Sequence, residues 1–380
     1  MPIPTKVALC DDIKQFNGDR LKDRTWSARF PGAAWATSLY ERQAQAGVEV
    51  ASGDVALARV RSGEWRAADV HVVQELDAWH GRALCALGAH PTVLTMLESP
   101  LVAYRQVDRM RKRIVPFACC IGPEWAWSRM RALARCRTFS LRFPCAWRAE
   151  LSESIAMPVS VEGRCGAVLV AANKRFRPTF RSQCTDLKCA LRAIRHGVRR
   201  SLSPTFRALH HAQLHDERIA LMAALGSRGM LDVWGPGWDR LDVMPRRLQR
   251  LLDPLKGRLM GPCAHKGKVL RRYRFAIAFE NTALPGYVTE KLIDALLAGC
   301  VPIYRGAPDV NHTVPSSAFV DSSRTGSSEQ TADLMARMDD GQAATIVSSG
   351  RAFLASPAAD IHTFEGFGDW IVELVKAHGR

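Results

Sequence analysis

The 380-residue sequence lacks several features that would place it in whole classes of protein. No apolar run approaches the roughly 18 residues that a membrane-spanning helix needs, so we expect no such helix. The first residues, MPIPTKVALCDD, contain no apolar core, and we expect no signal peptide. The 11 cysteines form no C-x-x-C pair, which argues against a zinc site or a disulfide framework. We therefore expect reduced thiols and a cytoplasmic protein.

Carboxylate pairs suited to a metal ion are also missing. No D-x-D motif follows a predicted strand, and Asp11-Asp12 and Asp339-Asp340 fit a loop and a helix end better. Divalent cations bound beside phosphates are usually held by such carboxylates. We therefore expect that the protein needs neither a metal ion nor another cofactor.

Acidic residues are scarce relative to basic ones. The sequence has 37 Asp and Glu against 53 Lys and Arg, which gives a formal net charge of +16. This charge favours anionic partners: a nucleotide diphosphate, an acidic membrane surface or nucleic acid. The basic residues are not regularly interleaved with aromatic ones, and no helix-turn-helix or zinc signature is present. We therefore expect no specific nucleic acid partner.

Strand and helix patterns alternate along a chain that is long enough for two domains. Short apolar runs at 6–10, 68–76 and 91–96, each followed by a helical pattern or a turn, predict a parallel α/β domain over 1–150. The polar stretch 142–163 is the predicted linker. A second α/β domain over 151–359 begins with the strand pattern at 166–173, and apolar positions predict a last helix within 360–380.

The stretch 274–311 is the most informative part of the sequence. An apolar run at 275–279 predicts a buried strand, Thr289 is suited to cap a helix that Gly299 ends, and 301–304 predicts the next strand. This is a βαβ unit, whose connection should be right-handed. Polar residues gather where the strand ends and the helix begins, the edge at which parallel sheets bind ligands. They are Glu280, Asn281, Tyr287, Glu290 and Lys291.

Three motifs in this stretch resemble, taken together, the signature of the α1,3/α1,4-fucosyltransferases, glycosyltransferase family 10. They are FENT at 279–282, YVTEK at 287–291 and AG-x-VPIY-x-G at 298–306. The resemblance implies a GT-B fold, with two Rossmann-like domains facing each other across a cleft. It implies that the first domain binds the acceptor and the second binds GDP-fucose, that the helix within 360–380 packs back on the first domain, and that transfer inverts the anomeric centre.

The chemistry of the departing GDP selects the candidate binding residues. Without a metal ion, cationic side chains must offset the growing charge of the diphosphate. Lys291 and Arg218, each near the start of a predicted helix, match the phosphate-binding Lys and Arg of the family. Glu280 has two interpretations, a contact to the nucleotide sugar or a structural carboxylate bonded to turn N–H groups. The other expected donor-binding residues are Asn281, Tyr287 and Glu290, with Asn173 and Gly235 at positions that resemble the family's second-domain turns.

The general base is expected in the first domain. Glu98 follows a predicted strand in the segment LESP at 97–100, which is similar to the family's E-S-P segment. Its rivals are His71, His80 and His90, but lone histidines are more often structural groups. Apart from Glu98, the first domain shows almost no resemblance to the family, which leaves the acceptor open.

Residues 174–215 form a basic insertion relative to shorter family members, with Lys174, Arg175 and Arg177 at its start. Its composition has two interpretations. One is a solvated basic helix; the other is a segment that contacts an acceptor or anionic lipid at the inner membrane face. Three functions follow from the sequence. The first is an inverting fucosyltransferase that uses an oligosaccharide or glycolipid acceptor; the second is the same fold with another GDP-sugar; the third is a nucleic-acid-binding basic protein.

Overall fold

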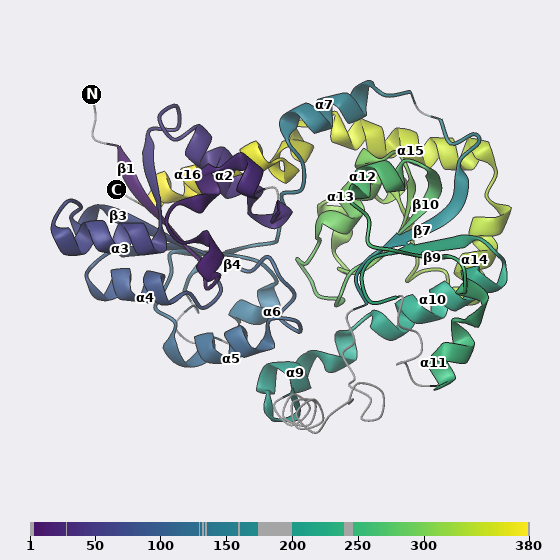
Figure 1. The fold of residues 1–380 in the computed structure, drawn as a ribbon, viewed down its shortest axis with the longest axis horizontal. Helices are drawn as coiled ribbons and strands as arrows, with labels where there is room; N and C mark the ends of the chain where they lie inside the picture. The colour runs from purple at the N-terminus through teal and green to yellow at the C-terminus, as the bar shows by residue number, and fades with distance from the viewer. Residues whose placement is uncertain are drawn as a thin grey trace. The chain divides into compact units, whose positions relative to one another are not determined.

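The computed structural model describes residues 4–27, 29–128, 130, 133, 135–158, 160–173, 200–238 and 246–378. The chain divides into two compact units. Unit 1 comprises Met1–Ser152, Leu284–Glu290 and Pro357–Arg380, and unit 2 comprises Glu153–Ala283 and Lys291–Ser356. Each unit has a six-stranded sheet with helices packed on it (Figure 1). The predicted α/β class, with two Rossmann-like halves, is confirmed.

The sheet of unit 1 is parallel at every described strand pair, in the order β2-β1-β3-β4-β5-β6. Its strands are short and mostly buried, as expected of parallel strands covered by helices. Their bounds are β1 (Thr5–Cys10), β2 (Val48–Ser52), β3 (Val70–Glu75), β4 (His90–Thr95), β5 (Cys119–Ile121) and β6 (Arg137–Phe139).

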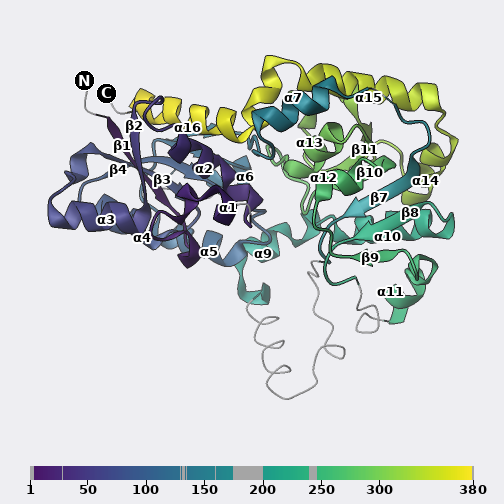
Figure 2. The same cartoon turned by 45° about the horizontal axis from the view of Figure 1, so that its top comes forward.

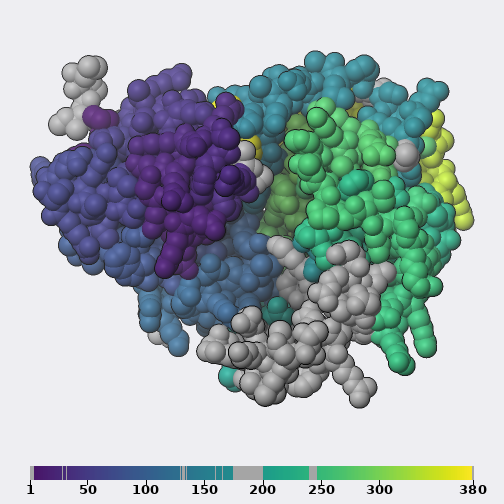
Figure 3. Space-filling view, viewed as in Figure 1, coloured from purple at the N-terminus to yellow at the C-terminus, as the bar shows by residue number. Residues whose placement is uncertain are grey.

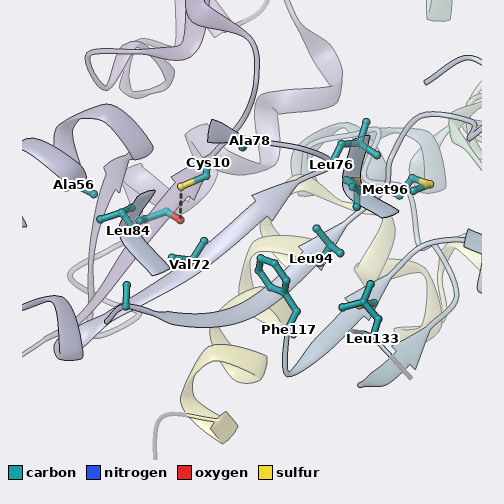
Figure 4. Packing of buried hydrophobic residues seen from close by; sticks show 14 of the residues in the cluster. Cys10, Ala56, Val72, Leu76, Ala78, Leu84, Leu94, Met96, Phe117 and Leu133 are labelled. Carbon is teal, nitrogen blue, oxygen red and sulfur yellow. Dashed lines mark hydrogen bonds between the residues drawn. The ribbon is translucent and has the colours of Figure 1, made fainter. Parts of the chain in front are cut away.

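The helices of unit 1 supply the apolar side chains that cover this sheet. Val72 of β3 and Leu94 of β4 share a buried cluster with Leu84 (Figure 4). The space-filling view shows the purple N-terminal residues on the visible face of this unit (Figure 3). The helices are α1 (Arg24–Ser27), α2 (Ala34–Glu41), α3 (Gly53–Ser62), α4 (Trp79–Ala86), α5 (Tyr104–Arg113), α6 (Glu124–Trp127) and α16 (Phe364–His378).

The C-terminal helix α16 belongs to unit 1, where it lies against α2. The rings of Trp35 and Phe367 meet edge to face with centroids 5.3 Å apart. Arg42 Nη1 donates to Asp369 Oδ1 at 2.8 Å beside this contact. The apolar face that the sequence shows at the C-terminus is thus buried within unit 1.

The sheet of unit 2 is also parallel, in the order β12-β11-β10-β7-β8-β9. Alternate residues of its central strands face two separate clusters: Phe275 and Ile277 lie in one, and Ala276 lies in the other. The strand bounds are β7 (Cys165–Val170), β8 (Leu231–Trp234), β9 (Leu259–Gly261), β10 (Tyr273–Phe279), β11 (Val301–Arg305) and β12 (Val320–Asp321).

Helices cover both faces of this second sheet. α10, α14 and α15 contribute side chains to one cluster, and α12 and α13 contribute to the other. Figure 2 shows the ribbons of these helices around the sheet. The bounds of the helices in unit 2 are α9 (Pro204–Leu209), α10 (His215–Ser227), α11 (Arg246–Leu251), α12 (Lys266–Leu270), α13 (Glu290–Leu297, whose first residue is grouped with unit 1), α14 (Ser328–Arg337) and α15 (Asp340–Leu354).

Some local elements were not predicted. The predicted linker at 142–163 contains a helix, α7 (Arg148–Ala156). The sequence did not indicate this helix because most of its residues are polar and form no apolar pattern. The helix α5 was missed because five of its ten residues are basic, although Tyr104, Val107 and Met110 are buried on one face. The basic insertion lies mostly outside the described residues, since 174–199 are not among them.

Candidate functional site

In unit 2, the direction in which the chain adds strands to the sheet changes between two neighbouring strands, β7 and β10. From β10 the chain continues outward to β11 and β12, and from β7 it continues the other way to β8 and β9. Open parallel sheets bind ligands beyond the carboxyl ends of the strands at such a switch point. The residues that follow β7, β8 and β10 therefore form the candidate site.

An ion pair lies at the end of β10. Glu280 follows the strand directly and is fully buried, and its Oε2 accepts a hydrogen bond from Lys291 Nζ at 3.0 Å. Lys291 lies in the first turn of α13, where the positive end of the helix adds to its charge. The backbone N–H of Glu280 donates to Arg305 O at 2.8 Å and fixes the strand end against β11. The pair is thus held by both sides of the βαβ unit.

Arg218 connects the start of α10 to the same strand end. Its Nη2 donates to Phe279 O at 2.8 Å and to Glu280 O at 2.9 Å, and the residue is 2 % exposed. The backbone reinforces this contact, because Leu214 N donates to Asn281 O at 3.2 Å. The two predicted phosphate-binding cations, Arg218 and Lys291, therefore both contact Glu280.

Sequence reasoning missed a third cation at this edge, Arg305, the last residue of β11. Its side chain pairs with Glu217 of α10. The signal for it was its position directly after the VPIY strand, next to the end of β10. Tyr304 also faces this region: burial raises its pKa well above the usual value, and the charge of Glu280 raises it further.

Asn173 and Gly235 lie together at the ends of β7 and β8. Asn173 Nδ2 donates to Gly237 O at 2.9 Å, and its backbone N–H donates to Pro236 O at 3.0 Å. Its Oδ1 is buried and accepts no hydrogen bond from a described residue. Gly235 has a φ of +135°, and a Cβ there would lie 2.2 Å from Ala171 O. The glycine therefore allows the two strand ends to approach closely.

We expect Gly235→Ala to lower the free energy of unfolding by about 3 kcal/mol, because the added methyl group collides with the Ala171 carbonyl. Gly229→Ala is the matched control, since Gly229 also has a positive φ, +64°, but a Cβ added there would meet no atom within 4 Å. That variant should lose only about 1 kcal/mol. Thermal or urea unfolding measures both. Equal losses would show that the close approach to Ala171 is not what requires a glycine.

Asn281, Tyr287 and Glu290 lie on or next to the loop between β10 and α13. Asn281 and Tyr287 are buried, and Glu290 is half-buried at the first position of α13. Leu284–Glu290 is grouped with unit 1, where Leu141 N donates to Gly286 O at 2.8 Å. The structure therefore brings Asn281 to the end of β10 with Arg218 and Lys291, and it assigns Tyr287 and Glu290 to the other unit.

Glu98 lies in unit 1, three residues after the end of β4. Its Oε1 accepts a hydrogen bond from Ser99 N at 2.9 Å. The rival histidines have other surroundings: His71 and His90 lie at the amino ends of β3 and β4, the opposite edge of the sheet. Burial lowers the pKa of His71 to about 4, so its ring is neutral at physiological pH. Glu98 is thus better placed than His71 and His90 for a carboxyl-edge site, whereas His80, the second residue of α4, also follows the carboxyl end of a strand.

Neither a metal cluster nor a membrane span is found in the described part of the chain. No group of three or more His, Cys, Asp or Glu side chains there is arranged to hold a metal ion. None of the helices built from those residues has the length and apolar character to cross a bilayer.

Comparison with known proteins shows a family likeness over part of the chain. Residues 206–345 match the model of the C-terminal part of glycosyltransferase family 10 (fucosyltransferase). An alpha-(1,4)-fucosyltransferase of Arabidopsis thaliana is 43% identical over 76 residues, 20% of this chain and 19% of that protein. The alpha-(1,3)-fucosyltransferase FucT of Helicobacter pylori is 45% identical over 56 residues, 15% of this chain and 12% of that protein.

A third relative, GDP-fucose protein O-fucosyltransferase 3 of Xenopus tropicalis, is 47% identical over 49 residues, 13% of this chain and 10% of that protein. The matches thus span between a tenth and a fifth of the length of these relatives.

Solved structures give the fold. The Anabaena HepE protein in complex with UDP is similar over 98% of this chain and 100% of that chain, with a TM-score of 0.52 and 13% sequence identity. An α1,3-fucosyltransferase with GDP has a TM-score of 0.46 and 15% identity, over 99% of this chain and 91% of that chain. The two parallel sheets and the likeness to HepE give a GT-B fold. Within this chain, residues 206–345 carry the likeness to glycosyltransferase family 10.

Proposed function

We propose that the protein transfers fucose from GDP-fucose to a hydroxyl group of a glycan acceptor with inversion at the anomeric carbon. The observation that carries this proposal is the pair of cations, Arg218 and Lys291, that contact Glu280 at the switch point of unit 2. Both lie inside the segment that matches the family model. A cationic strand end beside a helix start is suited to an anionic diphosphate.

The departing GDP gains negative charge as the bond to the sugar breaks. Lys291 supplies a compact positive charge at the start of α13, and Arg218 supplies a second one at the start of α10. Charges that are already in place stabilise the transition state without reorganisation. We propose that these two residues take the part that a metal ion plays in other glycosyltransferases, so that no cofactor is needed.

Neutral polar groups are suited to orient the nucleotide sugar. The buried Oδ1 of Asn173 is an acceptor that a ribose or guanine donor group would satisfy. Asn281, next to the ion pair, offers both a donor and an acceptor. Tyr287 and Glu290 remain predicted contacts to the nucleotide sugar, on the segment that precedes Lys291 in the chain.

Glu98 is the proposed general base. In a single displacement, the acceptor oxygen forms a bond to the anomeric carbon while the bond from that carbon to the GDP oxygen breaks. The acceptor proton passes to the Glu98 carboxylate, and GDP leaves as the free diphosphate. Attack opposite the leaving group inverts the configuration.

The proposal for the donor and the proposal for the acceptor have different support. The relatives share fucose in their names but differ in the linkage or acceptor that those names give, which include alpha-(1,4), alpha-(1,3) and protein O-fucosylation. We therefore propose GDP-fucose as the donor and an oligosaccharide or glycolipid as the acceptor. Hydrolysis or transfer with GDP-mannose but not with GDP-fucose would instead favour the second function, the same fold with another GDP-sugar.

Thermal unfolding with GDP tests the proposal. At a GDP concentration of about 100 times Kd, binding should stabilise unit 2 by about 2.7 kcal/mol, a rise in Tm of several degrees. The rise should persist in EDTA, because cationic side chains replace the metal. A random oligonucleotide should raise Tm weakly, and only at low salt. No response to GDP, together with a salt-resistant response to the oligonucleotide, would favour the nucleic-acid-binding function instead.

The membrane prediction concerns residues outside the described ranges. The basic residues of 174–199 carry the predicted contact with anionic lipid, and binding to vesicles with and without phosphatidylserine would test it. We propose peripheral contact at the inner membrane face only for this segment.

A further inference from the structure

A strained backbone position marks the end of β3 in unit 1. Leu76 has a φ of +48°, a region that residues with a Cβ rarely adopt. Its side chain is 5 % exposed and shares the apolar cluster of Met96 (Figure 4). Hydrogen bonds hold both sides of its peptide: Leu76 N donates to Thr95 O at 3.0 Å, and Gln74 Nε2 donates to Leu76 O at 2.6 Å. Such strain persists where the surroundings overdetermine it, often at functional sites.

The next residue is restrained as well. Asp77 is 4 % exposed, and its carboxylate accepts from Arg109 Nε at 2.8 Å and pairs with Arg82. Arg109 also donates to Asp12, which follows β1, at 3.1 Å. The turn after β3 is therefore tied to the loop after β1 and to α4 and α5. These contacts hold the backbone that follows Glu75, the residue before the strained leucine.

The Glu75 carboxyl group bridges two positions at the end of β4. Its Oε1 accepts a hydrogen bond from Leu97 N at 3.0 Å, and its Oε2 contacts Thr95 Oγ1. Leu97 is the residue directly before Glu98. The group thus holds the backbone N–H of Leu97, one residue before Glu98, although Glu75 lies at the end of β3 rather than β4.

We propose that Glu75 is a positioning residue that directs the Glu98 carboxylate by holding the backbone at Leu97. The proposal rests on the proposed function, in which Glu98 accepts the acceptor's proton. Glu75 itself need not touch either substrate.

The charge state of Glu75 fits this role. Burial, with added repulsion from the nearby carboxyl groups of Asp11 and Glu98, raises the pKa of Glu75 to about 8. The nearby cations Arg82 and Arg109 are paired with Asp77. Glu75 is therefore protonated at pH 7, which leaves Glu98 without a competing charge on that side.

The neutral form of Glu75 keeps both contacts. Oε1 still accepts from Leu97 N, and a proton on Oε2 donates to Thr95 Oγ1, whose own proton is then directed to Gln74 O at 3.3 Å. A glutamine amide has the same pattern, one acceptor and one donor. Glu75→Gln should therefore reproduce the anchor without a titratable group.

Kinetics of Glu75→Ala and Glu75→Gln test the proposal. Glu75→Ala should lower kcat about 10- to 100-fold at pH 7, with the KM for GDP-fucose and the Kd for GDP unchanged. Glu75→Gln should recover at least about a third of the wild-type kcat. Glu49→Ala is the matched control, since Glu49 lies on β2 of the same sheet and pairs with Arg59 at 2.8 Å; its kinetics should be those of the wild type.

The pH profile adds a readout that a purely structural role would not change. Wild-type kcat should fall as pH rises through about 8, because ionised Glu75 repels the Glu98 carboxylate. Glu75→Gln should lack this fall. A normal kcat in Glu75→Ala beside an inactive Glu98→Gln would overturn the positioning role and leave the proposed function standing. A glutamine variant as slow as the alanine variant, or one that keeps the fall near pH 8, would also overturn it.

Discussion

Replacement of Glu98 by glutamine is expected to lower kcat about 1000-fold, within the range that a general base contributes. The amide has nearly the same size as the carboxylate but cannot take up the acceptor's proton. The affinity for GDP should not change, since the proposed phosphate-binding cations, Arg218 and Lys291, belong to unit 2. Initial rates with GDP-fucose and an acceptor, together with calorimetric GDP titration, measure both quantities.

A carboxylate elsewhere on the same sheet edge provides the control. Glu124 is exposed at the start of α6, just after β5, and Glu124→Gln should keep the wild-type rate. A near-normal rate in Glu98→Gln would show that another group takes the proton. Loss of GDP binding in that variant would indicate a structural defect rather than a lost base.

Lys291→Ala has the second largest expected effect, a loss of GDP affinity of about 100-fold, or ~2.7 kcal/mol. The ammonium group is compact and lies at the positive end of α13, and the Lys291 side chain is only 15 % exposed. Removing it takes away the cation nearest to the buried Glu280 carboxylate, so Tm should fall as well. Calorimetry and thermal unfolding measure the two effects separately.

Two further variants distinguish a direct role from a structural one. Adding Glu280→Gln to Lys291→Ala should restore Tm but not GDP affinity, because the uncompensated buried charge is gone while the phosphate still lacks its cation. Lys266→Ala is the matched control: Lys266 pairs at 2.6 Å with Asp294, which lies on the same helix as Lys291, and its loss should leave GDP affinity intact. Recovery of GDP affinity in the double variant would refute a direct role for Lys291.

The fold of the candidate site was largely predictable from local sequence. The apolar run predicted at 275–279 lies within β10, and the run at 301–304 lies within β11. Parallel strands buried on both faces need continuous apolar residues, which is why such short runs were informative. Thr289 immediately precedes α13, as the capping pattern indicates.

The partners of the side chains were not predictable. Glu280 had two interpretations in the sequence, and only the structure shows its hydrogen bond to Lys291, 11 residues later. Arg218 reaches the carbonyl of Phe279, which is 61 residues away. The pairing of Arg305 with Glu217 gave no sequence signal, because the two residues lie on elements distant in the chain, β11 and α10. Such contacts depend on which helix packs beside which strand.

The sequence by itself determined the α/β class, the family likeness of residues 206–345 and the residue types available at the end of β10, because apolar periodicity and motif spacing are local properties of the chain. Only the tertiary structure decided which charges meet there, and that Glu75 of β3 holds the backbone N–H of Leu97, the residue before Glu98. The physical reason is that parallel strands distant in the chain end at a common edge of the sheet, where the packing of helices fixes the direction of each side chain.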